Sequence, residues 1–407
     1  MWAWILPLQV WRFIGSFPEE ELYGATRQSF EKTGHVCLHD SCRSRSTEAR
    51  AAPVEYTLTP PGEGPCPRVG HNCLYVPPHP KSGKSKVVIV GGADPNGSFS
   101  DGHIIDLERY EWKTTNWEGL LPRYEHASFI PSDSPGSIWV FGGADQAGNR
   151  NCLQVLKPET EMWKTPKVTG HLPSPRTFHT GSAAVGNRLY VFGGGDRRAE
   201  PVQDTQLHVF DASTLTWSQP RIDGKPPSSR HGHVAVAAGS KLFIHGGLAG
   251  DTFYDDLYCI DTNELKWEKL KTSGTIPPAC AAHAAAAVGK HIYIFGGMSP
   301  AGALDTMHRY HIEKQHWTLL EFESFLPPGR LDHSMCIIPW QGDSGFKEED
   351  GVKSEDEIEK ENLSDGTGGE VGDSDPRNRR ETLLCLVFGG MNTEGEIFSD
   401  CIATVVD

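Results

Sequence analysis

The chain has 407 residues, a formal net charge of −15 at pH 7, 37% hydrophobic residues and ten cysteines. The negative charge argues against general nucleic-acid binding, because an acidic surface is repelled by the phosphate backbone. No run of 18 apolar residues is present, so the sequence predicts no transmembrane helix and no direct membrane insertion.

Residues 1–53 carry no periodic pattern, and we expect a poorly ordered N-terminal extension. The apolar opening lacks a basic region and a small-residue cleavage site, so it does not read as a signal peptide. Four potential zinc ligands lie close together at His35, Cys37, His39 and Cys42. Their spacing does not match the paired ligands of a zinc knuckle, and we interpret them as a chance cluster.

An apolar run that ends in two glycines recurs six times along the rest of the chain. The first glycines of the pairs are Gly91, Gly142, Gly193, Gly246, Gly296 and Gly389. They follow one another at about 50 residues, except for a last step of about 93. Runs rich in β-branched and aromatic residues predict strands buried on both faces. The glycine pair predicts a crowded strand end with positive φ.

Further residues recur at fixed places around each glycine pair. An Arg-x-x-His pattern precedes the first strand of five repeats, at Arg68, Arg123, Arg176, Arg230 and Arg330, and Cys280 replaces the arginine in the fifth repeat. An Asp or Asn begins the third strand, and a Trp begins the fourth in five repeats. Four short antiparallel strands per repeat predict an all-β, six-bladed β-propeller.

The two ends of the chain complete each other in this pattern. The last repeat stops at Asp407 before its Trp position, and the equivalent place at the start of the repeats is Glu55. The segment 55–59 is therefore predicted to pair into the last blade and remove its free edge. Glu55 replaces the expected Trp, which predicts a weaker closure.

The long last step contains an insertion at residues 342–381. This segment holds 14 Asp or Glu and 6 Lys or Arg, and it has few apolar residues. It cannot bury enough apolar surface to offset the entropy of ordering, so we expect an acidic disordered insertion within the last blade.

The cysteines do not show a disulfide framework. Five of them fall within or beside predicted strands without paired spacing, at Cys73, Cys259, Cys336, Cys385 and Cys401. We interpret them as buried reduced thiols of a cytosolic protein.

The candidate partner-binding residues lie at one mouth of the propeller. The five arginines are open to two interpretations, a positive ring for an acidic partner or a scaffold that binds neighbouring carbonyls. The variable loops that follow the glycine pairs open on the same mouth, where recognition is expected. The predicted contact residues are Arg68, Arg123, Tyr124, Arg176, Arg230, Arg330, Phe99, Arg150, Arg197, Phe253 and Tyr254. The aromatic residues could instead pack beneath their own loops rather than contact a partner.

Enzymatic chemistry finds little support. Glu200, Asp204 and His208 have the four-residue spacing of the iron ligands in plant kelch nitrile-specifier proteins, and we interpret this as a chance match. No catalytic triad, paired-carboxylate site or phosphate loop emerges. We therefore predict a non-enzymatic protein without a resident metal or cofactor.

The repeat resembles the kelch family of β-propellers, over residues 54–407 apart from the insertion. The segments 121–129, 149–156, 327–335 and 388–396 are similar to kelch-only effectors of Rab GTPases on late endosomes. This resemblance implies binding to the GTP form of a late-endosomal Rab GTPase of the Rab-nine type. It also implies a role in vesicle transport from endosomes to the trans-Golgi network.

The same resemblance gives the expected location and the alternatives. It implies a cytoplasmic, monomeric protein that is peripheral on late-endosomal or trans-Golgi membranes. A substrate receptor for a ubiquitin ligase is the alternative binding function, and a metal-dependent kelch enzyme is a remote one.

Overall fold

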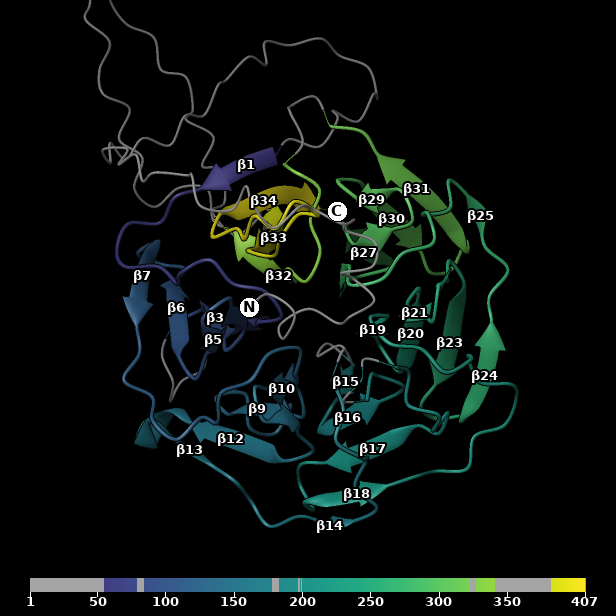
Figure 1. The fold of residues 1–407 in the computed structure, drawn as a ribbon, viewed down its shortest axis with the longest axis horizontal. Helices are drawn as coiled ribbons and strands as arrows, with labels where there is room; N and C mark the ends of the chain where they lie inside the picture. The colour runs from purple at the N-terminus through teal and green to yellow at the C-terminus, as the bar shows by residue number, and fades with distance from the viewer. Residues whose placement is uncertain are drawn as a thin grey trace, which may run out of the picture.

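Six antiparallel sheets stand around a central axis in the computed structural model of the chain (Figure 1). The structure describes residues 55–78, 84–177, 183–196, 198, 200–322, 327–340 and 382–406. The predicted extension (1–53) and the predicted insertion (342–381) lie outside these residues. The six-bladed β-propeller is therefore confirmed, while the interpretations of the two outer segments stay predictions.

Each blade is a sheet of four main strands, ordered from the channel outward. Blade 1 contains β2 (Asn72–Val76), β3 (Lys86–Val90), β6 (Gly102–Asp106) and β7 (Glu111–Thr114). Blade 2 contains β8 (Ala127–Phe129), β9 (Ile138–Phe141), β12 (Leu153–Lys157) and β13 (Met162–Lys164), with the 3-10 helix η2 (Pro158–Thr160). Blade 3 contains β15 (Ala184–Val185), β16 (Arg188–Val191), β17 (His208–Asp211) and β18 (Thr216–Ser218).

The other three blades follow the same order. Blade 4 contains β19 (Val234–Ala238), β20 (Lys241–His245), β23 (Leu257–Asp261) and β24 (Lys266–Lys269). Blade 5 contains β26 (Ala284–Val288), β27 (His291–Phe295), β30 (Met307–His311) and β31 (His316–Leu320). Blade 6 contains β32 (Ser334–Trp340), β33 (Thr382–Phe388), β34 (Cys401–Val406) and β1 (Glu55–Leu58).

Short strand pairs lie between the second and third strands of four blades. They are β4 (Ala93–Asp94) with β5 (Gly97–Ser98), β10 (Ala144–Asp145) with β11 (Gly148–Asn149), β21 (Leu248–Ala249) with β22 (Thr252–Phe253), and β28 (Met298–Ser299) with β29 (Gly302–Ala303). Two further short strands, β14 (Thr169–Gly170) and β25 (Ser273–Gly274), run parallel to the outer strand of the following blade.

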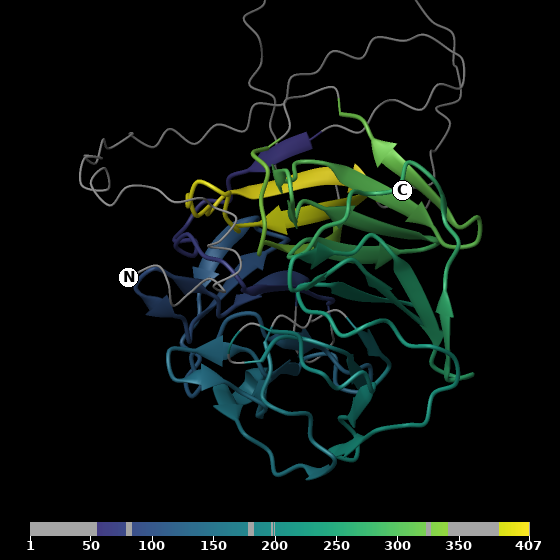
Figure 2. The ribbon, with the colours of Figure 1, turned by 45° about the vertical axis from the view of Figure 1, so that its right-hand side comes forward.

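The last blade is built from both ends of the chain. β1 pairs antiparallel with β34, from Glu55 opposite Thr404 to Leu58 opposite Cys401. Figures 1 and 2 show the purple β1 beside the yellow β34 in both views. Between β1 and β2, the Pro61 carbonyl accepts the Trp112 N–H of blade 1 at 2.7 Å. β1 thus occupies the outer-strand position that the repeat spacing assigns to it.

The core lies between the blades. Six clusters of buried apolar side chains each join two neighbouring blades, including the pair formed by blades 6 and 1. The outer-strand Trp takes part in each interface where it is present: Trp217 of blade 3 packs on Phe141 of blade 2 with ring centroids 4.8 Å apart. The predicted strands buried on both faces are therefore observed, and the five strand cysteines are buried and free.

Glycine pairs connect one blade to the next. At Gly389, φ is 62° and an added Cβ would lie 2.8 Å from the His71 ring of blade 1. His71 Nε2 also lies 3.1 Å from the Phe388 carbonyl oxygen, with which it forms a hydrogen bond. This histidine is a scaffold residue, as predicted, and only glycine fits beneath it.

Candidate partner-binding face

The connections between the second and third strands of all six blades lie on one face of the propeller, which we call the hairpin face. It comprises the residues 93–101, 144–151, 195–204, 248–256, 298–305 and 391–400, of which 197 and 199 are not described. Each connection forms a bridge to the loop that enters its own blade, as Val69 does with Ala93 and Leu331 with Met391. These bridges hold the connections over the channel mouth.

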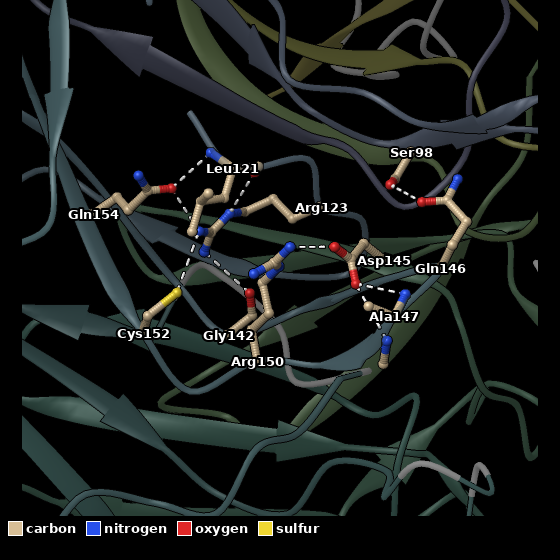
Figure 3. Close-up of polar contacts among 11 residues, drawn as sticks. Ser98, Leu121, Arg123, Gly142, Asp145, Gln146, Ala147, Arg150, Cys152 and Gln154 are labelled. Carbon is tan, nitrogen blue, oxygen red and sulfur yellow. Dashed lines mark hydrogen bonds and ion pairs between the residues drawn. The ribbon is translucent and has the colours of Figure 1, made fainter. Parts of the chain in front are cut away.

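Neighbouring hairpins also contact each other directly. Ser98 Oγ of blade 1 donates a hydrogen bond to Gln146 Oε1 of blade 2 at 2.9 Å (Figure 3). Asn149 Nδ2 of blade 2 donates to the Gly195 carbonyl of blade 3 at 3.1 Å. Part of the hairpin face is therefore a continuous surface that crosses blade boundaries.

The five arginines do not form a positive ring on this face. Their side chains are 0% exposed, and each donates a hydrogen bond from Nη1 to the first-glycine carbonyl of its own blade. Four of them also form ion pairs with the Asp at the start of the third strand: Arg68 with Asp101, Arg176 with Asp204, Arg230 with Asp256 and Arg330 with Asp400. The scaffold interpretation holds, because crossing loops need these donors to satisfy buried carbonyls.

Aromatic residues of the hairpins cover three of the arginines. The guanidinium carbon lies 4.3 Å from the Phe99 ring centroid for Arg68, and 4.0 Å from that of Tyr254 for Arg230. Phe398 covers Arg330 in the same way at 4.5 Å. Phe99 and Tyr254 are half-buried, so each has one side on an arginine and a remaining part open to solvent.

Blade 2 departs from this arrangement, as Figure 3 shows. Arg150 stands where blades 1, 4 and 6 place an aromatic residue, and its guanidinium forms an ion pair with Asp145. Arg123 has no carboxylate partner there and donates from Nη2 to Gln154 Oε1 at 2.6 Å. Burial lowers the pKa of Arg123. Arg150 is 23% exposed, which makes it the predicted arginine with the best access to a partner.

The remaining predicted residues lie at the edge of the channel or outside the described chain. Tyr124 is half-buried, and burial raises the pKa of its hydroxyl. Phe253 is half-buried and packs on a small apolar cluster of Val69, Met298, Leu331 and Met391 that joins blades 1, 5 and 6 at the mouth. Arg197 is outside the described residues, so its contacts stay a prediction.

The charge of the hairpin face is acidic rather than basic. In its described part the exposed or half-exposed basic side chains are Arg150 and Arg198, which pair with Asp145 and Asp196. The acidic side chains not held by a buried arginine are Asp94, Asp145, Asp196, Glu200, Asp251, Asp255, Asp305, Glu394 and Glu396. A positively charged partner surface therefore fits this face better than the acidic one expected from the arginines.

Two carboxyl groups that sequence reasoning missed lie at the channel. Glu125 and Asp332 line a cavity of about 140 Å³ at the axis, together with the repeat histidines. Burial raises the pKa of Asp332 to about 7, and burial with the nearby Asp332 raises the pKa of Glu125 well above its usual range. Both residues have positive φ, 50° and 53°. The sequence did contain a signal for them. Both lie two residues after the repeat arginine, at a position that is glycine in two other blades, Gly70 and Gly232.

The positions of Glu200, Asp204 and His208 show whether these three residues could bind one iron ion together. Asp204 Oδ2 lies 2.6 Å from His208 Nε2 and 3.6 Å from Arg176 Nη2. Glu200 does not converge with them: within the described ranges, the one group of three His, Cys, Asp or Glu side chains with converging donor atoms is His245, Cys280 and His283. His35, Cys37, His39 and Cys42 lie outside these ranges.

The chain belongs to the kelch-repeat family of β-propellers. The family model of the KLHDC2/KLHL20/DRC7 Kelch-repeats domain matches residues 52–196 and 135–342. In the described part of the chain no helix has the length and apolar character to cross a bilayer.

Curated relatives share most of the sequence. The chain is 69% identical to the human Rab9 effector protein with kelch motifs over 354 residues, which cover 86% of this chain and 95% of that protein. It is 71% identical to the bovine protein of the same name over 354 residues, which again cover 86% of this chain and 95% of the relative. The zebrafish protein of that name is 53% identical over 361 residues, 86% of this chain and 95% of the relative.

Proposed function

We propose that this chain is a non-enzymatic effector that binds a Rab GTPase of the Rab9 type in its GTP form. The observation that carries the proposal is the identity of 69% to a protein named a Rab9 effector, along 95% of that relative's length. The partner acts on late endosomes, and the chain serves vesicle transport to the trans-Golgi network as a cytoplasmic monomer recruited to the membrane by its partner.

We place the partner on the hairpin face. Six connections of different sequence stand on the blades, and a hydrogen-bonded arginine holds five of these blades in place, which suits recognition by variable loops on a rigid scaffold. Half-buried Phe99, Tyr254 and Phe253 offer apolar area, and the surrounding carboxylates select a partner with basic side chains. Dependence on GTP follows when the bound surface includes a switch segment that the γ-phosphate orders.

The first experiment is a pull-down of the purified chain against a panel of Rab GTPases, each loaded with GDP or with a non-hydrolysable GTP analogue. Capture of the Rab9-type protein in the GTP form alone is the expected result. Equal capture of both nucleotide forms, or no capture, contradicts the effector proposal and favours another binding function, such as substrate recruitment to a ubiquitin ligase.

A charge-reversal pair then tests the face itself. Asp251 and Asp305 are exposed on neighbouring hairpins, and Asp251→Lys with Asp305→Lys is expected to weaken GTP-form binding by about tenfold or more, with the loss largest at low salt. The matched control is Glu159→Lys with Glu264→Lys, which reverses two charges in turns at the opposite end of the blades. If both pairs of substitutions weaken binding equally, the partner does not bind at the hairpin face. The effector proposal would still stand in that case, provided that the parent captures the GTP form selectively.

A further inference from the structure

Two departures from the repeat meet at the interface of blades 4 and 5. At the end of the glycine-pair strand, four blades place a Phe, at Phe141, Phe192, Phe295 and Phe388, whereas blade 4 places His245. At the arginine position, blade 5 places Cys280. The Gly247 N–H of blade 4 donates to the Cys280 carbonyl at 2.8 Å, which brings both substitutions to one point.

The third member of the cluster is the repeat histidine of blade 5. His283 packs so closely on blade 4 that an added Cβ at Gly246 would lie 2.8 Å from its ring. His283 Nε2 is 3.1 Å from His245 Nδ1, and the ring centroids are 5.1 Å apart. One nitrogen from each histidine and the Cys280 sulfur all lie within 4.8 Å of one another.

We propose that His245, Cys280 and His283 form a binding site for one zinc ion. Two nitrogens bound to a tetrahedral zinc ion lie about 3.3 Å apart and a nitrogen and a sulfur about 3.6 Å apart, given Zn–N near 2.0–2.1 Å and Zn–S near 2.3 Å. The observed spacing needs only side-chain rotations to reach this geometry. Thiolate and imidazole donors select zinc over magnesium or calcium, which prefer oxygen.

The surroundings of the cluster support a ligand role over simple packing. The three side chains are buried, at 2%, 1% and 4% exposure. The two rings form a hydrogen bond with each other through one nitrogen each. The second nitrogen of each ring, His245 Nε2 and His283 Nδ1, has no hydrogen-bond partner although it is buried.

An entry path and a charge balance are also present. His283 lines the channel cavity of about 140 Å³, through which an ion reaches the interface. On binding, zinc would displace the proton of the Cys280 thiol, and the resulting thiolate neutralises one charge of the ion. Asp305, the residue that an arginine at position 280 would face, remains in blade 5.

The test uses two variants that restore the repeat and should therefore fold. His245→Phe and Cys280→Arg each introduce the residue that most other blades carry at that position. All proteins are full length and carry Cys37→Ser with Cys42→Ser, which removes the N-terminal cluster as a competing site. Cys66→Ser, at an exposed thiol, is the matched control.

Zinc is titrated against a chromogenic chelator under reducing conditions, and cobalt is added separately to read the thiolate-to-metal absorption band. We expect the parent and Cys66→Ser to bind one equivalent, both repeat-restoring variants to bind at least about tenfold more weakly, and Cys280→Arg to lose the cobalt–thiolate band. The melting temperatures of the parent and of Cys66→Ser should rise with zinc, whereas those of the two repeat-restoring variants should not. Absence of binding by the parent, or equal binding by the parent and the folded variants, overturns the site.

Discussion

At the scale of single residues, the arginines that begin the repeats are structural. Each guanidinium connects the loop that enters a blade to the glycine pair of the same blade, and the arginine carbonyl accepts the N–H of the second glycine of the preceding blade, as Arg68 does for Gly390 at 3.0 Å. An Asp balances the buried charge in four blades, and in blade 2 the arginine donates a hydrogen bond to Gln154 instead. Removing one such side chain leaves the glycine carbonyl and the other acceptors of the same blade without their donor.

We predict that Arg330→Met lowers the free energy of unfolding by about 2–3 kcal/mol, because it leaves the Gly389 carbonyl and the Asp400 carboxylate without their donor. Urea denaturation followed by tryptophan fluorescence measures the change. Arg198→Met is the control: that side chain is 82% exposed, and its surface ion pair contributes at most about 1 kcal/mol. Equal stability of both variants would mean that Arg330 has no scaffold role.

At the scale of elements, the interface between blades 5 and 6 is less well filled than the other interfaces. A cavity of about 20 Å³ lies there, lined among the described residues by Phe295, Met307, Phe322, Ile402 and neighbouring residues. Thr404, which also lines it, is the residue opposite Glu55. In the other interfaces the outer-strand Trp packs against the glycine-pair strand of the preceding blade. The ring centroids of Trp267 and Phe192, for example, are 5.5 Å apart.

Glu55→Trp is therefore expected to stabilise the protein by about 1 kcal/mol, because the outer-strand indole of other blades buries apolar area against the preceding blade, as Trp267 does against Phe192. Thermal unfolding by circular dichroism measures the gain as a higher melting temperature. Glu55→Gln separates the loss of charge from the gain of volume. A Trp variant no more stable than the Gln variant would show that the closure is not limited by packing.

The sequence predicted the elements well and the orientation of side chains less well. The glycine pairs and Trp112, Trp163 and their equivalents defined every blade, since burial between sheets restricts which residue types fit. The spacing of the arginines could not show whether their side chains point outward or inward, because both directions leave the same sequence pattern. The His245, Cys280 and His283 cluster could not be predicted, because its members come from different repeats and two of them break the repeat.

At the scale of the whole molecule, a ring of left-handed residues surrounds the channel. Gly70, Glu125, Gly232, Ala282 and Asp332 all have φ between 50° and 63°, and backbone hydrogen bonds join neighbours, as from Asp332 N–H to the Ala282 carbonyl at 2.9 Å. Two members carry carboxyl groups into the shared cavity. The five blades to which these residues belong are thus connected at the axis, where an ionised carboxyl group is costly.

We expect stability to depend on pH through Asp332. The pKa of this group is about 7 when folded against 3.8 for an unperturbed Asp, so the folded state binds the proton more tightly. Its contribution is most favourable below pH 4 and is lost as the pH rises from 4 to 7. Asp332→Asn should match the parent near pH 4 and be more stable by about 1–4 kcal/mol at pH 7.5.

Urea denaturation across this pH range tests the expectation. Asn keeps the size of the side chain and tolerates positive φ, so the variant isolates the charge. Asp251→Asn, at an exposed hairpin carboxylate, should leave the profile unchanged. Parallel profiles of Asp332→Asn and the parent would show that the channel carboxyl group ionises freely in the folded protein.

The pairing of β1 with β34 has a consequence for biosynthesis. Glu55 leaves the ribosome among the first residues of the propeller, and its partner Thr404 follows roughly 350 positions later. At about 5–20 residues per second, this early strand waits on the order of half a minute for its neighbour. During that time its backbone donors and acceptors are available to other nascent chains, so blade 6 is the part of the molecule whose assembly depends most on protection by chaperones.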